Sequence, residues 1–169
     1  VEHIIPLLHK QVGVERISKY VNRPLTGLKV AVHYGCHLIR PSRILKVDDA
    51  ERPVILDDLV NVTGATSVPY LRKMQCCGAP ASFVKKDASL QIMREKLLNV
   101  KRSGADCMVV ACPSCMVQFD ANQLAAQEVY NETYHIPVFY YSELLALAMG
   151  ISPKEFGFTH RVAIDAVSY

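Results

Sequence analysis

The sequence predicts an α/β domain in which helices flank a mostly parallel sheet. Short apolar runs rich in β-branched residues alternate along the chain with segments whose apolar residues recur at helical spacing. Two of these runs are followed directly by cysteines, and ligands of parallel sheets gather beyond the carboxyl ends of the strands. With 169 residues, of which 50% are hydrophobic and 21% charged, the chain has enough apolar side chains for the core of one domain.

Residues 1–26 are expected to form a helical lead-in, and residues 27–169 the main domain. Apolar residues over 7–12 and 14–21 predict two short helices, which Gly13 separates. A connector that contains proline and glycine then leads into the first strand. The chain starts with valine rather than methionine, and we interpret it as a fragment of a longer protein.

Two strands are expected to end in cysteines. The run over residues 28–34 is rich in β-forming residues, Gly35 ends it, and Cys36 follows immediately. The short apolar run over residues 107–111 has the composition of a buried strand and delivers Cys112 at its end. Two further strands are expected over residues 66–70 and 137–140. We therefore expect the cysteines at the carboxyl edge of the sheet.

Helices are expected between these strands. The strongest helical signal comes from four apolar residues that follow the spacing of a buried helical face, which are Leu90, Met93, Leu97 and Val100. Gly104 is placed to end this helix, and Asp87 or Ser89 to cap its start. The other expected helices cover residues 53–62, 114–129 and 142–150.

The charge pattern argues against nucleic acid as a partner. The 19 basic and 16 acidic residues are scattered along the chain, which gives a formal net charge of +3 and no basic stripe. No apolar run approaches the ~20 residues that span a bilayer, and the amino end lacks the layout of a secretion signal. The six cysteines lie in a chain rich in apolar residues, unlike those of disulfide-dense domains, which predicts a reducing, cytoplasmic compartment.

Five of the six cysteines form a spaced pattern. They are Cys36, the vicinal pair Cys76 and Cys77, and the Cys-x-x-Cys pair Cys112 and Cys115. A Cys-x-x-Cys pair alone also serves thioredoxin-like and zinc sites, but a zinc ion takes four ligands, whereas several bridged irons need more thiolates. We expect all five cysteines to bind an iron–sulfur cluster. A structural zinc domain that mediates the assembly of subunits and a metal-free dithiol oxidoreductase are the alternatives.

Two residues near the pattern have structural interpretations. Gly78 would let the backbone turn tightly, so that the sulfurs of Cys76 and Cys77 face a common centre. A disulfide within that vicinal pair would need a strained ring, so it is interpreted as an oxidation product. Cys107 lies in an apolar run outside the pattern and is expected to be a small core residue.

Polar residues close to the cysteines are candidates for substrate contacts. His33 and His37 flank Cys36, and a histidine near a strand end is more often a hydrogen-bonded core or rim residue than a metal ligand. An anionic substrate would meet His37, Arg40 and Lys85, all of which lie near motif cysteines in the sequence. The competing interpretation of these charged residues is an ordinary solvated surface.

Three motifs together resemble a known family. The string from His33 to Pro41, the Cys76-Cys77-Gly78 triplet and the Cys112-Pro113-Ser114-Cys115 segment resemble the cysteine-rich CCG domain found in the B subunit of heterodisulfide reductase. The resemblance covers residues 28–150. Members of that family resemble two such domains in tandem, so the resemblance implies that this chain is a fragment of a two-motif subunit. Its lead-in is typical of the carboxyl-terminal copy.

The resemblance implies a cofactor, a reaction and partners. The cofactor is a noncubane [4Fe–4S] cluster ligated by the five motif cysteines. The reaction is reduction of a mixed disulfide of the coenzyme M–coenzyme B type, with electrons that pass from a flavoprotein A subunit through a ferredoxin-like C subunit. Relatives with the same domain occur in succinate or fumarate reductases and in glycolate and lactate oxidation, so an electron-transfer role in such an enzyme is also implied.

Overall fold

The computed structural model describes residues 2–155 and contains one sheet of four strands. The strands are β1 (Lys29–His33), β2 (Thr66–Ser67), β3 (Cys107–Val110) and β4 (Val138–Tyr140). They lie in the order β2-β1-β3-β4, and each neighbouring pair is parallel. The expected α/β class with a mostly parallel sheet is therefore confirmed.

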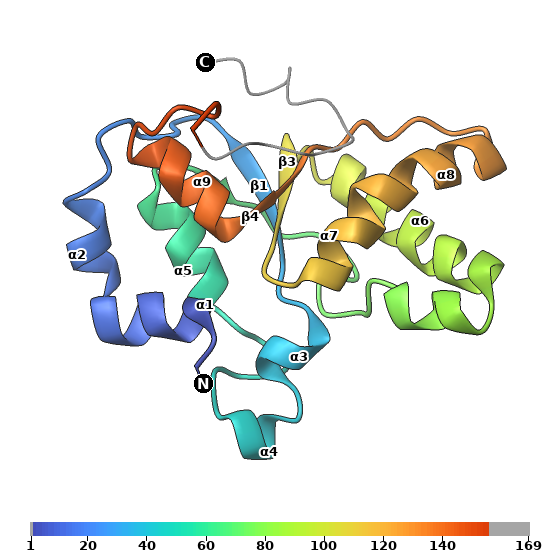
Figure 1. The fold of residues 1–169 in the computed structure, drawn as a ribbon, viewed down its shortest axis with the longest axis horizontal. Helices are drawn as coiled ribbons and strands as arrows, with labels where there is room; N and C mark the ends of the chain where they lie inside the picture. Colours follow the sequence, from blue (N-terminus) through green and yellow to red (C-terminus); the bar gives the residue numbers. More distant parts are fainter. Residues whose placement is uncertain (1, 156–169) are drawn as a thin grey trace.

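Helices cover both faces of this sheet (Figure 1). One face carries α1 (Ile4–Pro6), the π-helical segment η1 (Leu7–Val12), α2 (Val14–Ser18), α5 (Ile55–Val62) and α9 (Tyr141–Ala148). The other face carries the 3₁₀ segment η2 (Ala79–Phe83), α6 (Lys86–Arg102), α7 (Pro113–Phe119) and α8 (Ala121–Tyr130). Two short helices, α3 (Cys36–Ile39) and α4 (Ser42–Leu45), follow β1.

Alternation along the strands sends side chains into two separate cores. Val30 and Val32 of β1 belong to the core beneath α5 and α9, whereas Ala31 belongs to the core beneath α6 and α7. In β3, Cys107 joins the first core and Met108 the second. Strand register places Val30 beside Cys107, so residues that face the same way are neighbours across the two strands.

The segment before β1 contains helices up to Ser18, and it packs on the α5 face. Gly13, with a φ of +83°, separates η1 from α2, and α2 ends earlier than expected. Ile5 and Ile17 are buried in the same core as β1. The division of the chain at residue 27 stays a prediction, and residues 156–169 of the expected main domain lie outside the described residues.

The single helix expected over residues 114–129 is wrong. A break at Asp120, with φ of −90° and ψ of −74°, separates α7 from α8. At this break the buried Gln123 donates through Nε2 to the Phe119 carbonyl at 2.7 Å. The same amide exchanges hydrogen bonds with the backbone of Ile136 at 2.9 and 3.0 Å, just before β4. Pairing of a buried amide with a distant segment thus overrides the continuous helical pattern.

The expected caps of α6 are wrong as well. Lys85 occupies the N-cap position, and no side chain caps the helix there. Asp87 lies in the first turn, and Ser89 is buried, where its hydroxyl accepts a hydrogen bond from Gln118 Nε2 at 3.0 Å. The chain enters α6 directly from η2, with the Lys85 amide donating to the Ala81 carbonyl at 2.8 Å. The helix therefore begins before both predicted caps.

The remaining expected elements are present in shorter form. The helix expected over residues 53–62 is α5, and the strand expected over residues 66–70 is the short β2. Gly104 follows the C-cap of α6 with a φ of +71°, as expected of a residue that ends a helix. Within residues 2–155, no helix has both the length and the apolar character needed to cross a membrane.

Candidate metal centre

Two turns of the candidate site meet at the carboxyl ends of β1 and β3, which are neighbours in the sheet. β1 ends at His33, two residues before Gly35 and three before Cys36, and β3 ends at Val110, two residues before Cys112. A Cβ atom on Gly35 would lie 3.3 Å from Cβ of Cys112 and 3.7 Å from Sγ of Cys115. The two turns are therefore in contact, and Gly35, with a φ of +74°, leaves the room for this approach.

The vicinal pair reaches the same place on a tight turn, as the sequence predicts. Gly78 adopts a left-handed conformation with a φ of +92°, and a Cβ atom there would lie 2.7 Å from the Ser89 carbonyl oxygen. The Gly78 amide donates to the Cys76 sulfur at 3.4 Å. The Ala79 amide donates to the Cys77 sulfur at 3.5 Å. Both sulfurs are thus oriented by the backbone that follows them.

The five motif thiols interact with one another across these turns. The charges of Cys77 and Cys112 act on Cys115, and those of Cys76 and Cys77 act on Cys36. Hydrogen bonding between Cys77 and Cys115 lowers the pKa of Cys77 and raises the pKa of Cys115, while burial raises the pKa of Cys36. Cys77 and Cys115 are buried, and the other three are half-buried. The motif therefore forms one site with a buried base and an open edge.

His33 lies beside the buried base of this site. One ring nitrogen of His33 and the sulfurs of Cys77 and Cys115 all lie within 4.8 Å of one another. Its Nε2 is buried without a hydrogen-bond partner among residues 2–155, and its Nδ1 lies 3.4 Å from Lys96 Nζ. Burial lowers the pKa of His33 and favours the neutral imidazole. The sequence indicated a core or rim histidine; its contact with the cysteines was not predicted.

Sequence reasoning missed Lys96, which lies in α6 with only 1% of its surface exposed. Its Nζ donates to backbone carbonyls of the turn before Cys76 and approaches His33. Burial lowers the pKa of Lys96 to about 8, although the cysteines, Cys77 first, act in the opposite direction. The sequence does not indicate that this ammonium is buried, because a lysine on the apolar side of a helix commonly extends its amine into water.

The three predicted substrate residues differ in exposure and in their partners. His37 is exposed on α3, and Lys85 is exposed at the start of α6. Arg40 donates to the carbonyls of Met74 at 3.2 Å and Ala50 at 3.1 Å, so its guanidinium is engaged with the protein backbone. Substrate contact by these three residues stays a prediction.

Two cavities are lined by direct neighbours of motif cysteines. One, of about 330 Å³, lies between the lead-in and α3, and its lining includes the basic residues His3, Lys10, His37 and Lys46 together with Glu2. The other, of about 370 Å³, is a mainly apolar groove between η2 and α7, and its lining includes Pro80, Phe83, Pro113 and Val117. His37 follows Cys36 and Pro113 follows Cys112 in the sequence, so each cavity borders a segment that carries motif cysteines, although no motif cysteine lines either cavity.

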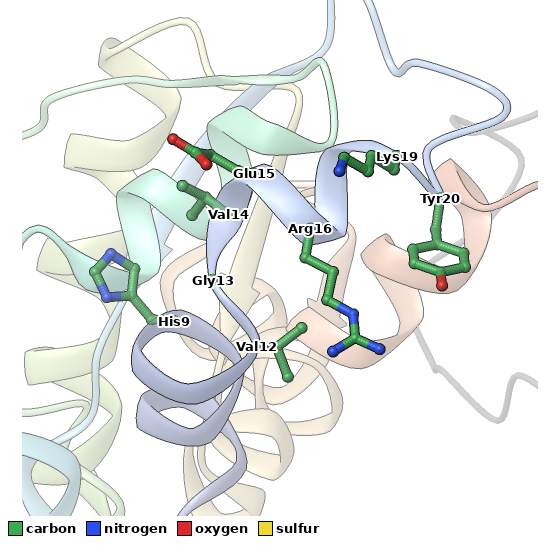
Figure 2. A pocket seen from close by; sticks show the side chains of 8 residues that line it. All are labelled: His9, Val12, Gly13, Val14, Glu15, Arg16, Lys19 and Tyr20. Carbon is green, nitrogen blue, oxygen red and sulfur yellow. The ribbon is translucent and has the colours of Figure 1, made fainter.

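A larger cavity, of about 610 Å³, lies around Gly13 (Figure 2). Residues of η1 and α2 line it together with Lys19 and Tyr20, and none of the motif cysteines does. His9 at its margin lies with Nε2 3.0 Å from Asp58 Oδ2, so it ties the lead-in to α5. This cavity is separate from the cysteine site.

The cysteine-rich region matches a known family. The CCG profile, described as a cysteine-rich domain, matches residues 30–120. The B subunit of the "Ferredoxin/F(420)H(2)-dependent CoB-CoM heterodisulfide reductase" of Methanosarcina acetivorans is 48% identical over 93% of this chain and 53% of its own length. The "8-methylmenaquinol:fumarate reductase membrane anchor subunit" of Wolinella succinogenes is 36% identical over 91% of this chain and 54% of its own length. The chain spans about half the length of these curated relatives.

A solved structure shares the fold. The crystal structure of a hypothetical protein from Helicobacter pylori superposes with a TM-score of 0.63 and 19% sequence identity. The match covers 89% of this chain and 28% of that chain. At this level of identity the likeness concerns the fold alone, and it agrees with the α/β architecture of residues 2–155.

Proposed function

The chain belongs to the CCG cysteine-rich domain family, and from this premise we propose that it is the iron–sulfur part of a B-type subunit of heterodisulfide reductase. The five motif cysteines hold a noncubane [4Fe–4S] cluster at the carboxyl edge of the sheet. The chain forms the carboxyl-terminal of two such domains. It works in a reducing compartment, the cytoplasm, with two partners, which are a ferredoxin-like C subunit that carries iron–sulfur clusters, and a flavoprotein A subunit.

The observation that carries this proposal is the convergence of five thiols in one site. A tetrahedral zinc ion would leave one of them unused, whereas several bridged irons use all five. The donor set fits a cluster in a second respect, because the amides of Gly78 and Ala79 already point at sulfurs. Hydrogen bonds of this kind stabilise the anionic sulfur of a metal centre and tune its potential.

The proposed reaction is the reduction of a mixed disulfide. The sulfur–sulfur bond breaks, two electrons and two protons are consumed, and two thiols are released. The electrons reach the site from the flavoprotein through the partner iron–sulfur protein, and the protons come from water. A bound cluster supplies electrons singly and offers iron with an affinity for sulfur.

The two cavities beside the cysteines suit the two halves of such a substrate. The basic cavity lined by His37 and Lys46 suits a thiol with an anionic group, and the groove beside Phe83 suits an apolar one. Two lining residues of these cavities, His37 and Pro113, directly follow the half-buried Cys36 and Cys112 in the sequence. Of the three predicted substrate residues, His37 lines the basic cavity, and Arg40 lines a small cleft together with Cys36.

Anaerobic reconstitution with iron and sulfide tests the proposal. We expect about four irons per chain for a [4Fe–4S] site, with an electron paramagnetic resonance signal that changes when a mixed disulfide with one anionic and one alkyl half is added. A symmetric disulfide of two neutral thiols is the matched control and should change the signal less. Zinc alone at one ion per chain, in a colourless protein, would contradict the cluster.

A structural zinc site is the second candidate function. One specific observation favours it: His33, Cys77 and Cys115 can place their ligand atoms within 4.8 Å of one another, and a further motif thiol would complete a tetrahedron. This candidate requires that at least one of the five cysteines can be replaced without loss of metal. An electron-transfer subunit related to the fumarate reductase relative would keep the cluster but show no signal change with disulfides.

A further inference from the structure

Four successive backbone carbonyls precede the vicinal cysteines, and two cationic side chains hold all of them. Lys96 Nζ lies 2.5 Å from the carbonyl oxygen of Arg72, 3.1 Å from that of Lys73 and 2.8 Å from that of Gln75. Arg40 Nη1 donates to the remaining one, that of Met74, at 3.2 Å. The turn that leads into Cys76 is therefore built around these two cations.

The surroundings of Lys96 make its charge unusual. The ring of Tyr70 lies 5.8 Å from Nζ, and Nδ1 of His33 lies 3.4 Å away. The partners that the structure shows for Nζ are carbonyl oxygens, this ring and this imidazole, and none of these described partners is a carboxylate. A buried cation without an anionic partner is costly, so the opposite charge must come from elsewhere.

The motif cysteines are the groups that can supply this opposite charge. Lys96 Nζ lies 3.4 Å from Nδ1 of His33, and a ring nitrogen of His33 lies within 4.8 Å of the sulfurs of Cys77 and Cys115. The charges of the cysteines raise the pKa of Lys96 against the effect of burial, with Cys77 acting most strongly. Lys73, in the same turn, is different, because it pairs with the carboxylate of Asp57 at 2.6 and 2.8 Å. Lys96 therefore differs from Lys73 and from Arg40, which lies 3.7 Å from the Glu51 carboxylate, because none of the partners shown for its ammonium is a carboxylate.

We propose that Lys96 is a positioning residue for the cluster, which fixes the turn of residues 72–75 and supplies a buried positive charge behind the motif thiolates. This inference rests on the proposed function, because it assigns the charge a role toward a cluster bound at those thiolates. The ammonium has two effects. Its hydrogen bonds set the direction from which Cys76 and Cys77 approach, and its charge stabilises the more reduced, more negative state of the site.

Three variants separate these effects. Lys96→Met keeps the length of the side chain but removes both the charge and the donors, whereas Lys96→Gln removes the charge and keeps an amide donor. Lys101→Met is the matched control on the same helix, since Lys101 is exposed and donates to the Thr133 carbonyl. The readouts are iron retention after anaerobic reconstitution, the midpoint potential of the bound cluster, and hydrogen exchange of the amides of residues 76–78 in the metal-free protein.

We expect Lys96→Met to lose iron about 10-fold faster than the unaltered protein and to exchange the amides of residues 76–78 faster. Lys96→Gln should retain iron better than Lys96→Met, and both should shift the midpoint potential to more negative values. Lys101→Met should change none of these. An unchanged potential in both Lys96 variants would overturn the charge role, and unchanged exchange with unchanged iron retention would overturn the positioning role.

The design distinguishes this inference from the proposed function. If the unaltered protein takes up no iron and sulfide, the proposed function fails, and hydrogen exchange of the metal-free variants alone decides whether Lys96 holds the turn. If Lys96→Met does not fold, the midpoint potential of Lys96→Gln alone tests the charge role, because the glutamine amide can still donate to the turn. A cluster that is retained equally in all variants, with an unshifted potential, would refute the inference while the proposed function stands.

Discussion

The two faces of the sheet both bury cysteines but treat them differently. Cys107 points into the core beneath α5 and α9, among aliphatic side chains, and is fully buried. Cys77 and Cys115 are buried in the core beneath α6 and α7, where His33 approaches them. Because neighbouring residues of a strand face opposite ways, register alone assigns Cys107 to the aliphatic side. Burial alone therefore does not distinguish a motif cysteine from a core cysteine, whereas the side of the sheet on which the thiol lies does.

The distribution of buried polar residues follows the same division. On the α5 face, the buried Thr63 hydroxyl donates a hydrogen bond to the Val60 carbonyl at the end of α5. On the α6 face, buried polar side chains include Ser89, Lys96, Gln118 and Gln123, which bond to distant segments. A buried polar group that loses its hydrogen-bond partner costs free energy. The hydrogen bonds between distant segments therefore hold the backbone of the loops that carry the cysteines in one conformation.

The sharpest test of this comparison replaces one cysteine on each face. Cys77→Ser should abolish or convert the cluster, because the proposed cluster uses all five motif thiolates as ligands and the hydroxyl of serine is a poorer ligand for iron. Cys76→Ser, and the same change at any other motif cysteine, should do likewise. Iron and sulfide analysis after anaerobic reconstitution measures the effect, with Cys107→Ser as the matched control. Full occupancy in any single motif variant would contradict the five-cysteine site and favour zinc.

Replacement of Gly78, in the turn that follows the vicinal cysteines on the α6 face, should give the next largest effect. Gly78→Val should impair cluster assembly, because its Cβ would lie 2.7 Å from the Ser89 carbonyl oxygen and also crowd Ile92. The left-handed backbone alone costs about 1 to 3 kcal/mol for a residue other than glycine, and the clash adds to it.

Gly104→Val separates the two contributions. Gly104 has a φ of +71°, but a Cβ atom there would meet no other atom of the described residues within 4 Å beyond its chain neighbours, so only the backbone cost applies. Thermal unfolding and iron content are compared for both variants. Equal iron content in the two would show that the approach of Gly78 to Ser89 does not shape the site.

On the aliphatic face, the expected effect is on stability alone. Cys107→Ser places a hydroxyl in an apolar core and should lower the free energy of unfolding by roughly 1 to 3 kcal/mol. Burial raises the pKa of the Cys107 thiol to about 12, with Asp106 adding to the shift, so this side chain is a neutral thiol at ordinary pH. Denaturant unfolding of the metal-free protein measures the cost. Iron loss equal to that of Cys77→Ser would reverse the assignment of the two faces.

The sequence supports the prediction of some features because they are local. The strand that leads toward Cys36, the end of the helix before Gly104 and the turn at Gly78 each follow from a few consecutive residues, and the structure confirms these backbone features. The cysteine spacing, together with the parallel order of the strands, also predicts where the site lies. These predictions need no knowledge of which segments touch.

Features that depend on distant contacts could not be predicted. Lys96 meets the turn before Cys76 only in the folded chain, and a lysine at that position resembles any surface lysine in the sequence. The break at Asp120 is coupled to the pairing of Gln123 with Ile136, which a helical pattern does not reveal. Arg40 was expected to meet substrate, and its engagement with loop carbonyls is likewise visible only in three dimensions.

The smallest expected effect concerns a charged cluster on the α6 face, away from the motif cysteines. Arg94 of α6 pairs with Glu132 through two hydrogen bonds, and the Tyr134 hydroxyl donates to the same carboxylate at 2.5 Å. The hydrogen bond from Arg94, followed by that from Tyr134, lowers the pKa of Glu132 from 4.5 to about 2. Because the folded pKa is the lower one, the unfolded chain binds the proton first as pH falls.

The contribution of Glu132 to stability is therefore complete above about pH 4.5 and is lost as pH falls toward 2. Glu132→Gln should be less stable than the unaltered metal-free protein at pH 6, and the difference should shrink between pH 4.5 and pH 2. Urea unfolding at several pH values measures this, and raised salt should reduce the difference, because the pair is partly exposed. Iron content at neutral pH should not change. A stability difference that grows on acidification would contradict the direction of the pKa shift. A loss of iron would show that residues beyond those surrounding the cysteines also affect metal binding.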